Sequence, residues 1–506
     1  MNINIDIGMN INIDIGMDMD TDTDMNMGII PNTPLIVDLD GTLLQSDMIS
    51  ESVIKVLHKN PTYLLYIPFW LLRGKAAFKQ HLAQLANVDP SVLPYNQEIL
   101  AWLRQQRDLG RRLILCTASD KFIADKIATY LGIFDDVMAS DGIVNLSGEH
   151  KAAALVQRFG EKGFDYIGNA CIDLAVWKRA RRAIVVTAKA ALIKKAGACC
   201  EIERIFPLPA FEWKTGYQVL RVHQWLKNSL LFVPLLAAHQ FTHVSSWLTL
   251  ILAFFAFGFC ASSVYVVNDL LDLESDRQHP RKCKRPFVAG SVPLWIGVIL
   301  TPLLLMISLV LAEGIGITFS LWLLLYFGLT CAYSCGLKRL ILVDCLILAM
   351  LYTLRIVAGA SALDLKLSFW LLAFSVFLFF SLAFIKRYAE LQTQLLHGKH
   401  KVHGRGYYSS DAPLIQMLGI ASGYASVLVL ALYLNSDAVS YLYHTPAIVW
   451  GAVPIVLFWI SWMWMQAHRG NMHDDPVLFA LQDKVSLIAG AAFAAVLILA
   501  TIGWPW

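Results

Sequence analysis

The chain of 506 residues has few charged residues, 16% of the sequence, where ordinary soluble domains have about 25%. Its formal net charge is only +3, and no segment combines a basic stripe with aromatic residues, so we exclude nucleic-acid binding. The nine cysteines are odd in number and lack the spacing of metal-binding motifs. This pattern indicates a reduced protein whose soluble part faces the cytosol.

The N-terminal segment has neither the basic region nor the apolar region of a signal peptide. Residues 1–28 instead contain MNINIDIG twice, followed by alternating Met, Asp and Thr. Low-complexity acidic sequence of this kind does not support a packed core. We expect residues 1–28 to be a disordered tail, or the product of a misplaced start codon.

Hydrophobic residues make up 57% of the chain and are unevenly distributed. Residues 29–215 have the composition of a soluble domain, whereas residues 216–506 contain apolar runs of about 20 residues, the length needed to cross a bilayer. The nine candidate spans are 219–238, 246–268, 292–312, 315–334, 340–361, 368–386, 413–434, 445–466 and 485–504. Most Lys and Arg residues between these spans fall on the side of the soluble domain, and Lys366 falls on the other side. The positive-inside rule therefore predicts a multi-pass protein of the bacterial inner membrane with a cytoplasmic N-terminal domain.

The soluble part alternates apolar strands with helical stretches. LIVDLDGTLL at 35–44, RRLILCTAS at 111–119 and FDYIGN at 164–169 each read as a buried strand that runs into a loop. This alternation predicts a doubly wound α/β domain with a parallel sheet. Residues 60–95 interrupt the pattern with PTYLLYIPFWLL, which is too short to span a bilayer. We predict a helical cap insertion that touches the bilayer surface.

The segment Asp38-Leu-Asp40-Gly-Thr directly follows the first strand and resembles the first motif of the haloacid dehalogenase superfamily. The resemblance implies that Asp38 attacks phosphorus and that Asp40 is the general acid and base. It also implies that Thr117 and Lys151, as the second and third motifs, contact the substrate.

The fourth motif of that superfamily corresponds to Gly168-Asn169-Ala-Cys-Ile-Asp173. By resemblance, a Mg²⁺ ion would be held by Asp38, Asp40, Asn169 and Asp173. Asn169 replaces the usual aspartate, and a neutral amide attracts the metal less strongly. Both a catalytic and a degenerate, structural role are therefore open for this domain.

An acidic motif, Asn-Asp-Leu-Leu-Asp-Leu-Glu-Ser-Asp at 268–276, ends the second candidate span. Asp269, Asp272 and Asp276 are three and four residues apart and would share one face of a helix. Crowded carboxylates repel one another unless cations bridge them, and Mg²⁺ with substrate phosphate oxygens is the usual solution. The basic run that includes Lys282 and Arg285 follows and could neutralise a diphosphate. The alternative is a solvated cluster of charges beside the membrane.

The acidic motif resembles the first aspartate-rich motif of UbiA-type prenyltransferases, a nine-helix family with a Mg²⁺–diphosphate site at the cytosolic ends of its helices. Five further segments resemble the branch of that family that contains decaprenyl-phosphate phosphoribosyltransferase: RVHQWLKN at 221–228, YSCGLKRLILVD at 333–344, LRIVAGA at 354–360, FIKRYAEL at 384–391 and RGNMHDDPVLFALQD at 469–483. That branch transfers 5-phosphoribose from phosphoribosyl diphosphate to a polyprenyl phosphate, whereas other branches prenylate aromatic rings or haem.

The resemblance assigns roles to individual residues. It implies that the Mg²⁺–diphosphate ligands are Asn268, Asp269, Asp272 and Asp276, that the second motif consists of Tyr333, Lys338 and Asp344, and that the site is lined by Lys227, Asn228, Lys282, Arg285 and Arg355. An arginine within an apolar span usually faces a polar cavity. The second motif offers Asp344 alone and not a pair of aspartates, which favours the phosphoribosyl branch.

We therefore expect phosphoribosyl transfer to a polyprenyl phosphate, with a fused phosphatase-like domain. One alternative is a prenyltransferase that uses a polyprenyl diphosphate and an aromatic or other small acceptor. A transporter or a lipid-binding scaffold is the alternative outside enzymes. Transport sites lie near the midplane between repeated halves, whereas here the acidic motif lies at one membrane face and the membrane part has no internal repeat.

Overall fold

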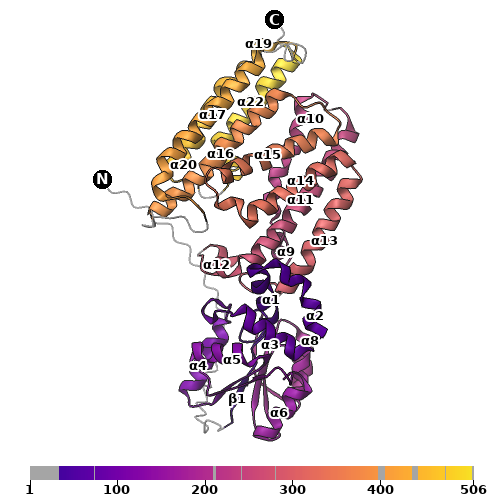
Figure 1. The fold of residues 1–506 in the computed structure, drawn as a ribbon, viewed down its shortest axis with the longest axis vertical. Helices are drawn as coiled ribbons and strands as arrows, with labels where there is room; N and C mark the ends of the chain where they lie inside the picture. Colours follow the sequence, from indigo (N-terminus) through magenta and orange to yellow (C-terminus); the bar gives the residue numbers. More distant parts are fainter. Residues whose placement is uncertain are drawn as a thin grey trace, which may run out of the picture.

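The computed structural model describes residues 33–503, apart from 73, 209–211, 241, 280, 397–404, 436–442 and 473–474. The predicted tail, residues 1–28, lies outside the described residues. Figure 1 shows an α/β domain and a bundle of long helices that follow one another along the longest axis of the molecule. The last strand of the α/β domain ends at Phe206, and the first helix of the other part begins at Trp213.

The α/β domain is built on six parallel strands, which confirms the predicted sheet. The strand order is β3-β2-β1-β4-β5-β6. The strands are β1 (Leu35–Val37), β2 (Leu113–Asp120), β3 (Asp136–Ser140), β4 (Asp165–Gly168), β5 (Arg182–Val186) and β6 (Glu201–Phe206). Ligands of such sheets bind beyond the carboxyl ends of the strands where the order reverses, here between β1 and β4.

Side chains from successive residues of β1 enter two different hydrophobic cores. Leu35 and Val37 belong to one core and Ile36 to the other, because alternate strand residues point to opposite faces of a sheet. The helices that supply the rest of these cores are α1 (Met48–Lys59), α3 (Lys75–Ala86), α4 (Gln97–Asp108), α5 (Lys121–Leu131), α6 (Glu149–Phe159), α7 (Leu174–Trp177) and α8 (Ala190–Gly197). Both faces of the sheet are therefore covered.

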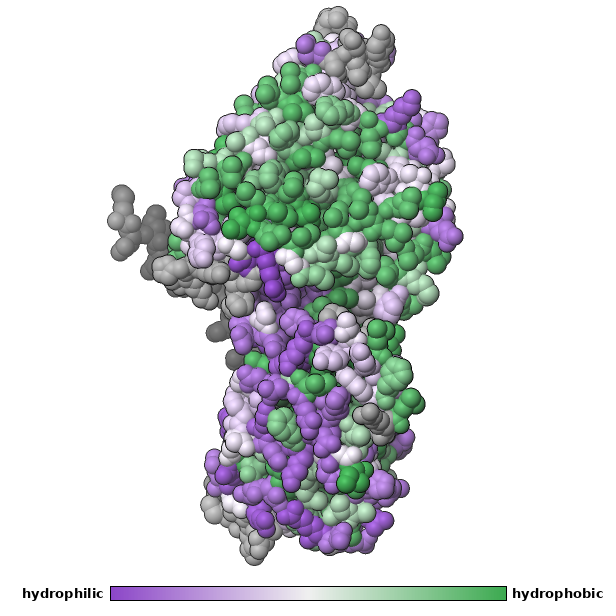
Figure 2. Space-filling view, viewed as in Figure 1, coloured by the Kyte–Doolittle hydropathy of each residue, from purple (hydrophilic) through white to green (hydrophobic). Residues whose placement is uncertain are grey.

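The insertion after α1 is helical, consisting of η1 (Pro61–Leu65), α2 (Ile67–Leu72) and then α3. α3 packs into the core through Phe78 and Leu82, whereas Leu65, Phe69 and Leu72 of the segment before it are 73%, 65% and 84% exposed. Figure 2 shows a hydrophobic patch on the otherwise mostly hydrophilic α/β domain, at the position of α2 in Figure 1. Contact of this patch with lipid stays a prediction.

The helical part contains eight helices, among the described residues, that are long and apolar enough to cross a membrane. They are α11 (Val244–Leu271), α13 (Leu294–Glu313), α14 (Ile317–Cys335), α15 (Val343–Ala362), α16 (Phe369–Leu396), a helix at Ser409–Leu434 that includes α17 (Ala412–Leu434), a helix at Pro446–His468 formed by α19 (Pro446–Val449) and α20 (Ala452–His468), and α22 (Lys484–Ile502). Figure 2 shows hydrophobic residues over most of the visible face of this part.

The prediction of a helical span at 219–238 is wrong. The segment forms the 3-10 helix η4 (Val222–Phe232) and the short helix α10 (Val233–Ala237). A Cβ on Gly359 would lie 2.1 Å from the carbonyl oxygen of Leu231, so the backbones of η4 and α15 are in direct contact. Irregular backbone at membrane depth is tolerated where protein buries it.

The two parts meet at α1. Ile54 of α1 packs in a hydrophobic cluster with Val266 and Leu270 of α11 and with Phe287. Figure 1 shows α1 between the sheet and three helices of the other part, α9 (Trp213–Val219), α12 (Leu273–Arg277) and α13. The α/β domain is therefore attached next to the acidic motif.

Candidate functional site

The acidic motif lies at the end of α11 that faces the α/β domain. The helix ends at Leu271, Asp272 is its C-terminal cap, and α12 begins at Leu273. Asp269 and Asp276 are buried, whereas the side chain of Asp272 is 40% exposed. The predicted single helix face is therefore interrupted, because the chain leaves the helix between the first and the last aspartate. Asn268 is half-buried in the last turn of α11.

Four cations neutralise the three aspartates. Arg221 forms an ion pair with Asp269. Arg285 bridges two aspartates, with Nη1 3.0 Å from Oδ1 of Asp269 and also paired with Asp276.

The other two cations lie further from their carboxylates. Nζ of Lys282 is 3.3 Å from Oδ1 of Asp276, and Nζ of Lys338 is 3.8 Å from Oδ2 of Asp272. The predicted site residues Lys282, Arg285 and Lys338 are therefore brought to the aspartates, and Arg221 joins them as a residue that the sequence reasoning missed.

A Mg²⁺ ion fits this arrangement only together with a ligand. The described residues include no group of three or more His, Cys, Asp or Glu side chains that could hold a metal by themselves. Among them, Oδ1 of Asp276 is buried without a hydrogen bond, and Asp272 is partly open to solvent. Mg²⁺ is commonly held by one or two carboxylates plus substrate phosphates. Asp269, Asp272 and Asp276 would supply the carboxylates.

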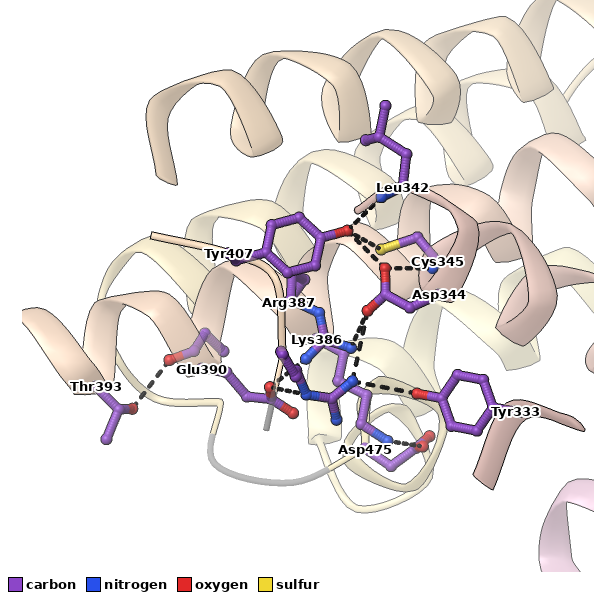
Figure 3. A network of polar contacts seen from close by, with 12 residues as sticks. Tyr333, Leu342, Asp344, Cys345, Lys386, Arg387, Glu390, Thr393, Tyr407 and Asp475 are labelled. Atoms are coloured by element: carbon purple, nitrogen blue, oxygen red, sulfur yellow. Dashed lines mark hydrogen bonds and ion pairs between the residues drawn. The ribbon is translucent and has the colours of Figure 1, made fainter. Parts of the chain in front are cut away.

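The second motif is divided between two places. Lys338 faces the acidic motif, but Asp344 is fully buried and pairs with Arg387, at 2.6 Å between Oδ2 and Nη2 (Figure 3). Oδ1 of Asp344 accepts a hydrogen bond from the Tyr407 hydroxyl at 2.5 Å. In this arrangement the Asp344 carboxylate holds α15 against α16, and no contact supports a catalytic role.

Figure 3 shows that the network around Asp344 also reaches Tyr333 and Glu390. Arg405 donates to the Tyr333 hydroxyl at 3.2 Å and pairs with Glu390, with Nε 3.3 Å from Oε2. Tyr333 thus lies in the network of Asp344, as the shared motif predicts, but it contacts an arginine and not an aspartate.

Asp475 is a site residue that the sequence reasoning missed. It accepts hydrogen bonds from Lys227 at 2.7 Å, Lys386 at 3.2 Å and the Tyr352 hydroxyl at 2.9 Å. Burial opposes ionisation of Asp475, but Lys386 and Lys227 outweigh it and hold the pKa of this carboxyl well below its usual range. A cavity beside this group is lined by Leu348, Tyr352, Leu382, Ala383, Lys386, Asp475, Pro476 and Val477.

Arg355 is buried in the centre of α15 and is fully engaged. Its Nε donates to Asn228 at 3.0 Å, Nη2 to the Tyr326 hydroxyl at 2.9 Å and Nη1 to the Leu351 carbonyl at 2.6 Å. The predicted proximity of Asn228 and Arg355 is thus found in the structure, whereas Lys227 points to Asp475 instead. These contacts satisfy an arginine that would be expensive in lipid.

The second candidate site lies at the carboxyl end of β1. Asp38 pairs with Lys151, at 2.7 Å between Oδ1 and Nζ, and Lys151 also donates to the Tyr166 hydroxyl at 3.0 Å. Tyr166 in turn donates to Asp173 at 2.9 Å. Burial raises the pKa of Asp38 to about 7, and Lys151 opposes that rise. Three predicted residues from distant parts of the sequence, Asp38, Lys151 and Asp173, therefore meet at the carboxyl end of β1.

Asp40 lies on the other side of this site. Its carboxylate accepts hydrogen bonds from the Met48 N–H at 2.8 Å and the Ser119 hydroxyl at 2.7 Å. The predicted Thr117 does not contact Asp40 in these hydrogen bonds. Its hydroxyl accepts from the Ser119 N–H at 3.0 Å and so helps to position Ser119. Burial raises the pKa of Asp40, which favours the protonated form that a general acid needs.

Two of the four predicted metal ligands of this domain, Asn169 and Asp173, lie on the loop that follows β4. Asp173 accepts the Tyr166 hydroxyl on Oδ1 and the N–H groups of Asn169 and Ala170 on Oδ2, so its contacts hold the loop after β4 and do not fit a metal ligand. A Cβ on Gly41 would lie 2.2 Å from Nδ2 of Asn169, which places this amide beside the Asp38 loop.

Lys79, which the sequence reasoning also missed, reaches the α/β site from α3 of the cap insertion. Its Nζ donates to the carbonyl of Ala118 at 2.6 Å and to Oδ1 of Asn145 at 2.9 Å. Burial lowers the pKa of Lys79, and its charge acts on Asp40. The insertion therefore supplies a cation to the site.

Comparison with known proteins gives a named family for the helical part. The profile of the UbiA prenyltransferase family matches residues 229–488. The uncharacterized protein y4nM of Sinorhizobium fredii is 38% identical over 92% of this chain and 91% of that protein. The nodulation protein NoeC of Azorhizobium caulinodans is 36% identical over 54% of this chain and 89% of that protein. A decaprenyl-phosphate phosphoribosyltransferase of Mycolicibacterium smegmatis is 31% identical over 53% of this chain and 86% of that enzyme.

Proposed function

Since the chain belongs to the UbiA prenyltransferase family, we propose that it transfers 5-phosphoribose from phosphoribosyl diphosphate to a polyprenyl phosphate. The reaction takes place at the acidic motif, on the cytosolic face of the bacterial inner membrane. The name of the Mycolicibacterium smegmatis relative supports this choice of substrates.

The observation that carries the proposal is the excess of cations at the acidic motif. Three aspartates face four cationic side chains, Arg221, Lys282, Arg285 and Lys338. A Mg²⁺ ion bound to the aspartates would release these cations to hold an anionic ligand. Phosphoribosyl diphosphate carries a 5-phosphate in addition to its diphosphate, so it offers these four cations more phosphate oxygens than a prenyl diphosphate does.

The chemistry requires positioning and charge neutralisation. An oxygen of the lipid phosphate attacks the anomeric carbon of the donor, the bond from that carbon to the diphosphate oxygen breaks, and the diphosphate leaves with the electron pair. Mg²⁺, when bound, would neutralise part of the developing charge. Arg285, which already bridges Asp269 and Asp276, is placed to neutralise the rest.

We further propose that the α/β domain is a phosphatase for the phosphorylated product. Transfer leaves a 5-phosphate on the lipid-linked sugar at the membrane face where α1 attaches the domain. Asp38 attacks the phosphorus while Asp40 donates a proton to the leaving alcohol. Water then hydrolyses the aspartyl phosphate, and Asp40 takes back a proton. Tethering the two sites raises their effective concentration to roughly millimolar levels.

Labelled phosphoribosyl diphosphate, supplied with a panel of polyprenyl phosphates to the purified full-length protein, tests the first proposal. Lipid-linked phosphoribose is the expected product, and it should disappear in EDTA. Prenylated 4-hydroxybenzoate formed from a polyprenyl diphosphate, without any lipid-linked phosphoribose, would establish the alternative function. Transport of the lipid without either product would overturn both.

A further inference from the structure

The contact between the two parts of the molecule contains a buried ion pair. Nη2 and Nη1 of Arg277 lie 2.6 Å and 3.2 Å from the two carboxylate oxygens of Glu51. The two side chains are only 8% and 6% exposed. Glu51 belongs to α1 of the α/β domain, and Arg277 to α12. A bidentate pair of this kind fixes direction as well as distance.

The ion pair acts on the segment that carries the acidic motif. α12 has only five residues, Leu273–Arg277, and so short a helix has little stability of its own. Asp276 directly precedes Arg277 and pairs with Arg285 and Lys282. A second ion pair, Lys55 with Glu274, also joins α1 to α12. The orientation of Asp276 therefore depends on a helix of the other domain.

α1 is itself held in place on both sides. Its first residue, Met48, donates its N–H to Asp40 of the α/β site at 2.8 Å. A Cβ on Gly290 of the membrane part would lie 2.6 Å from Cβ of Gln45, so the chain just before α1 touches the loop that follows Arg285. Glu51 is thus presented at a fixed position.

We propose that Glu51 is a positioning residue of the membrane site, contributed by the α/β domain. It holds Arg277 away from Asp276 and so leaves this aspartate to Arg285, Lys282 and a Mg²⁺-bound diphosphate. The nature of the ligand rests on the proposed function. The α/β domain is then a structural component of the transferase site, whether or not its own site is catalytic.

Substituting Glu51 by Gln should release Arg277. A buried arginine without its charged partner is strongly unfavourable, and we expect Arg277 to turn towards Asp276, the neighbouring carboxylate of α12. The released arginine would compete with Mg²⁺ for that carboxylate. The affinity for Mg²⁺ with inorganic diphosphate should therefore fall by about tenfold, while the KM for the lipid acceptor stays unchanged.

Calorimetric titration of the full-length protein with inorganic diphosphate in Mg²⁺ measures this effect. The matched control is Glu161→Gln, which removes one partner of an exposed ion pair with Arg179 in the same domain and should bind diphosphate as the wild type does. The double variant E51Q/R277Q removes both buried charges and should recover most of the affinity. Wild-type affinity in E51Q, or a double variant as weak as E51Q, would overturn the proposal.

Hydrogen exchange of residues 269–277 without ligand gives a second measurement that does not depend on the reaction. Exchange should be faster in E51Q than in the wild type and close to normal in the double variant. Unchanged exchange in E51Q would overturn the positioning role even if the wild type bound no diphosphate. Conversely, normal diphosphate binding without phosphoribosyl transfer would refute the proposed function and leave the role of Glu51 intact.

Discussion

The two candidate sites use charge in different ways. At the α/β site, Asp38 pairs with Lys151 in a closed chain that continues through Tyr166 to Asp173. At the membrane site, three aspartates meet four cations, and one carboxylate oxygen of Asp276 has no hydrogen bond among the described residues. The first site holds one carboxylate in a continuous hydrogen-bonded chain, whereas the second has more cationic side chains than carboxylates.

The largest effect that separates the two sites is expected from Asp272→Asn. The half-exposed Asp272 is the aspartate most accessible to a metal-bound ligand, so transfer should fall by about 100- to 1000-fold. Phosphate release at the α/β site should not change. Glu313→Gln, which changes an exposed carboxylate at the last residue of α13, is the control. Near-normal transfer by Asp272→Asn, measured with labelled donor, would remove the metal assignment.

Asp38→Asn should have the opposite selectivity. Loss of the nucleophile should lower phosphate release from isolated lipid-linked phosphoribose by roughly 1000-fold and leave transfer intact. If wild type and variant release phosphate equally, or neither does at high Mg²⁺, the α/β domain has no phosphatase role. The membrane site would then be compared with an α/β site that has lost its catalytic role.

The pH dependence of phosphate release tests the ionisation of Asp38 at the α/β site. Burial raises the pKa of Asp38 to about 7 and Lys151 opposes the rise, so activity that needs ionised Asp38 should increase as the pH rises through about 7. Lys151→Gln removes the opposing charge and should move this increase to higher pH by about 1–3 units. A rate profile of the variant that coincides with that of the wild type would exclude Asp38 as the titrating group.

A smaller effect tests where the α/β domain lies relative to the bilayer. The side chain of Leu72 in α2 is 84% exposed, and an interfacial helix buries such side chains among lipid headgroups. A fluorophore on Leu72→Cys should be quenched by brominated lipids in nanodiscs, whereas one on Tyr130→Cys in α5, which Figure 1 shows on the other side of the domain, should not. Absence of quenching at the Leu72→Cys position would mean that α2 faces water.

Local sequence patterns predicted the strands of the α/β domain and the long helices of the membrane part. Alternating apolar strands and helical stretches indicated the parallel sheet, and long apolar runs indicated the eight long helices. The span at 219–238 was mistaken, because apolar composition does not distinguish a membrane helix from a 3-10 segment buried against α15.

Residues with distant partners could be predicted where a motif marked them, as for Asp38 and Lys151, but not where no motif did. Lys227 and Asp475 are 248 positions apart, and no spacing rule connects them. Two local signals mark Asp475: it lies in the segment 469–483 that resembles the family, and it precedes a proline, where its carboxylate caps α21 (Pro476–Ala480). Lys79 had no signal at all, since a lysine in a cap helix is usually a surface residue.

The backbone contact between η4 and α15 has a consequence for how the protein is assembled in the membrane. A 3-10 helix has poorer hydrogen-bond geometry than an α-helix, and lipid offers no substitute partners. The segment 222–232 therefore cannot enter the bilayer by itself as it leaves the ribosome, although it precedes every long helix in the sequence. We therefore expect it to reach its final place only when α15 provides Gly359, at a position with no side chain to keep the Leu231 carbonyl away. Synthesis order and insertion order are thus expected to differ in this chain.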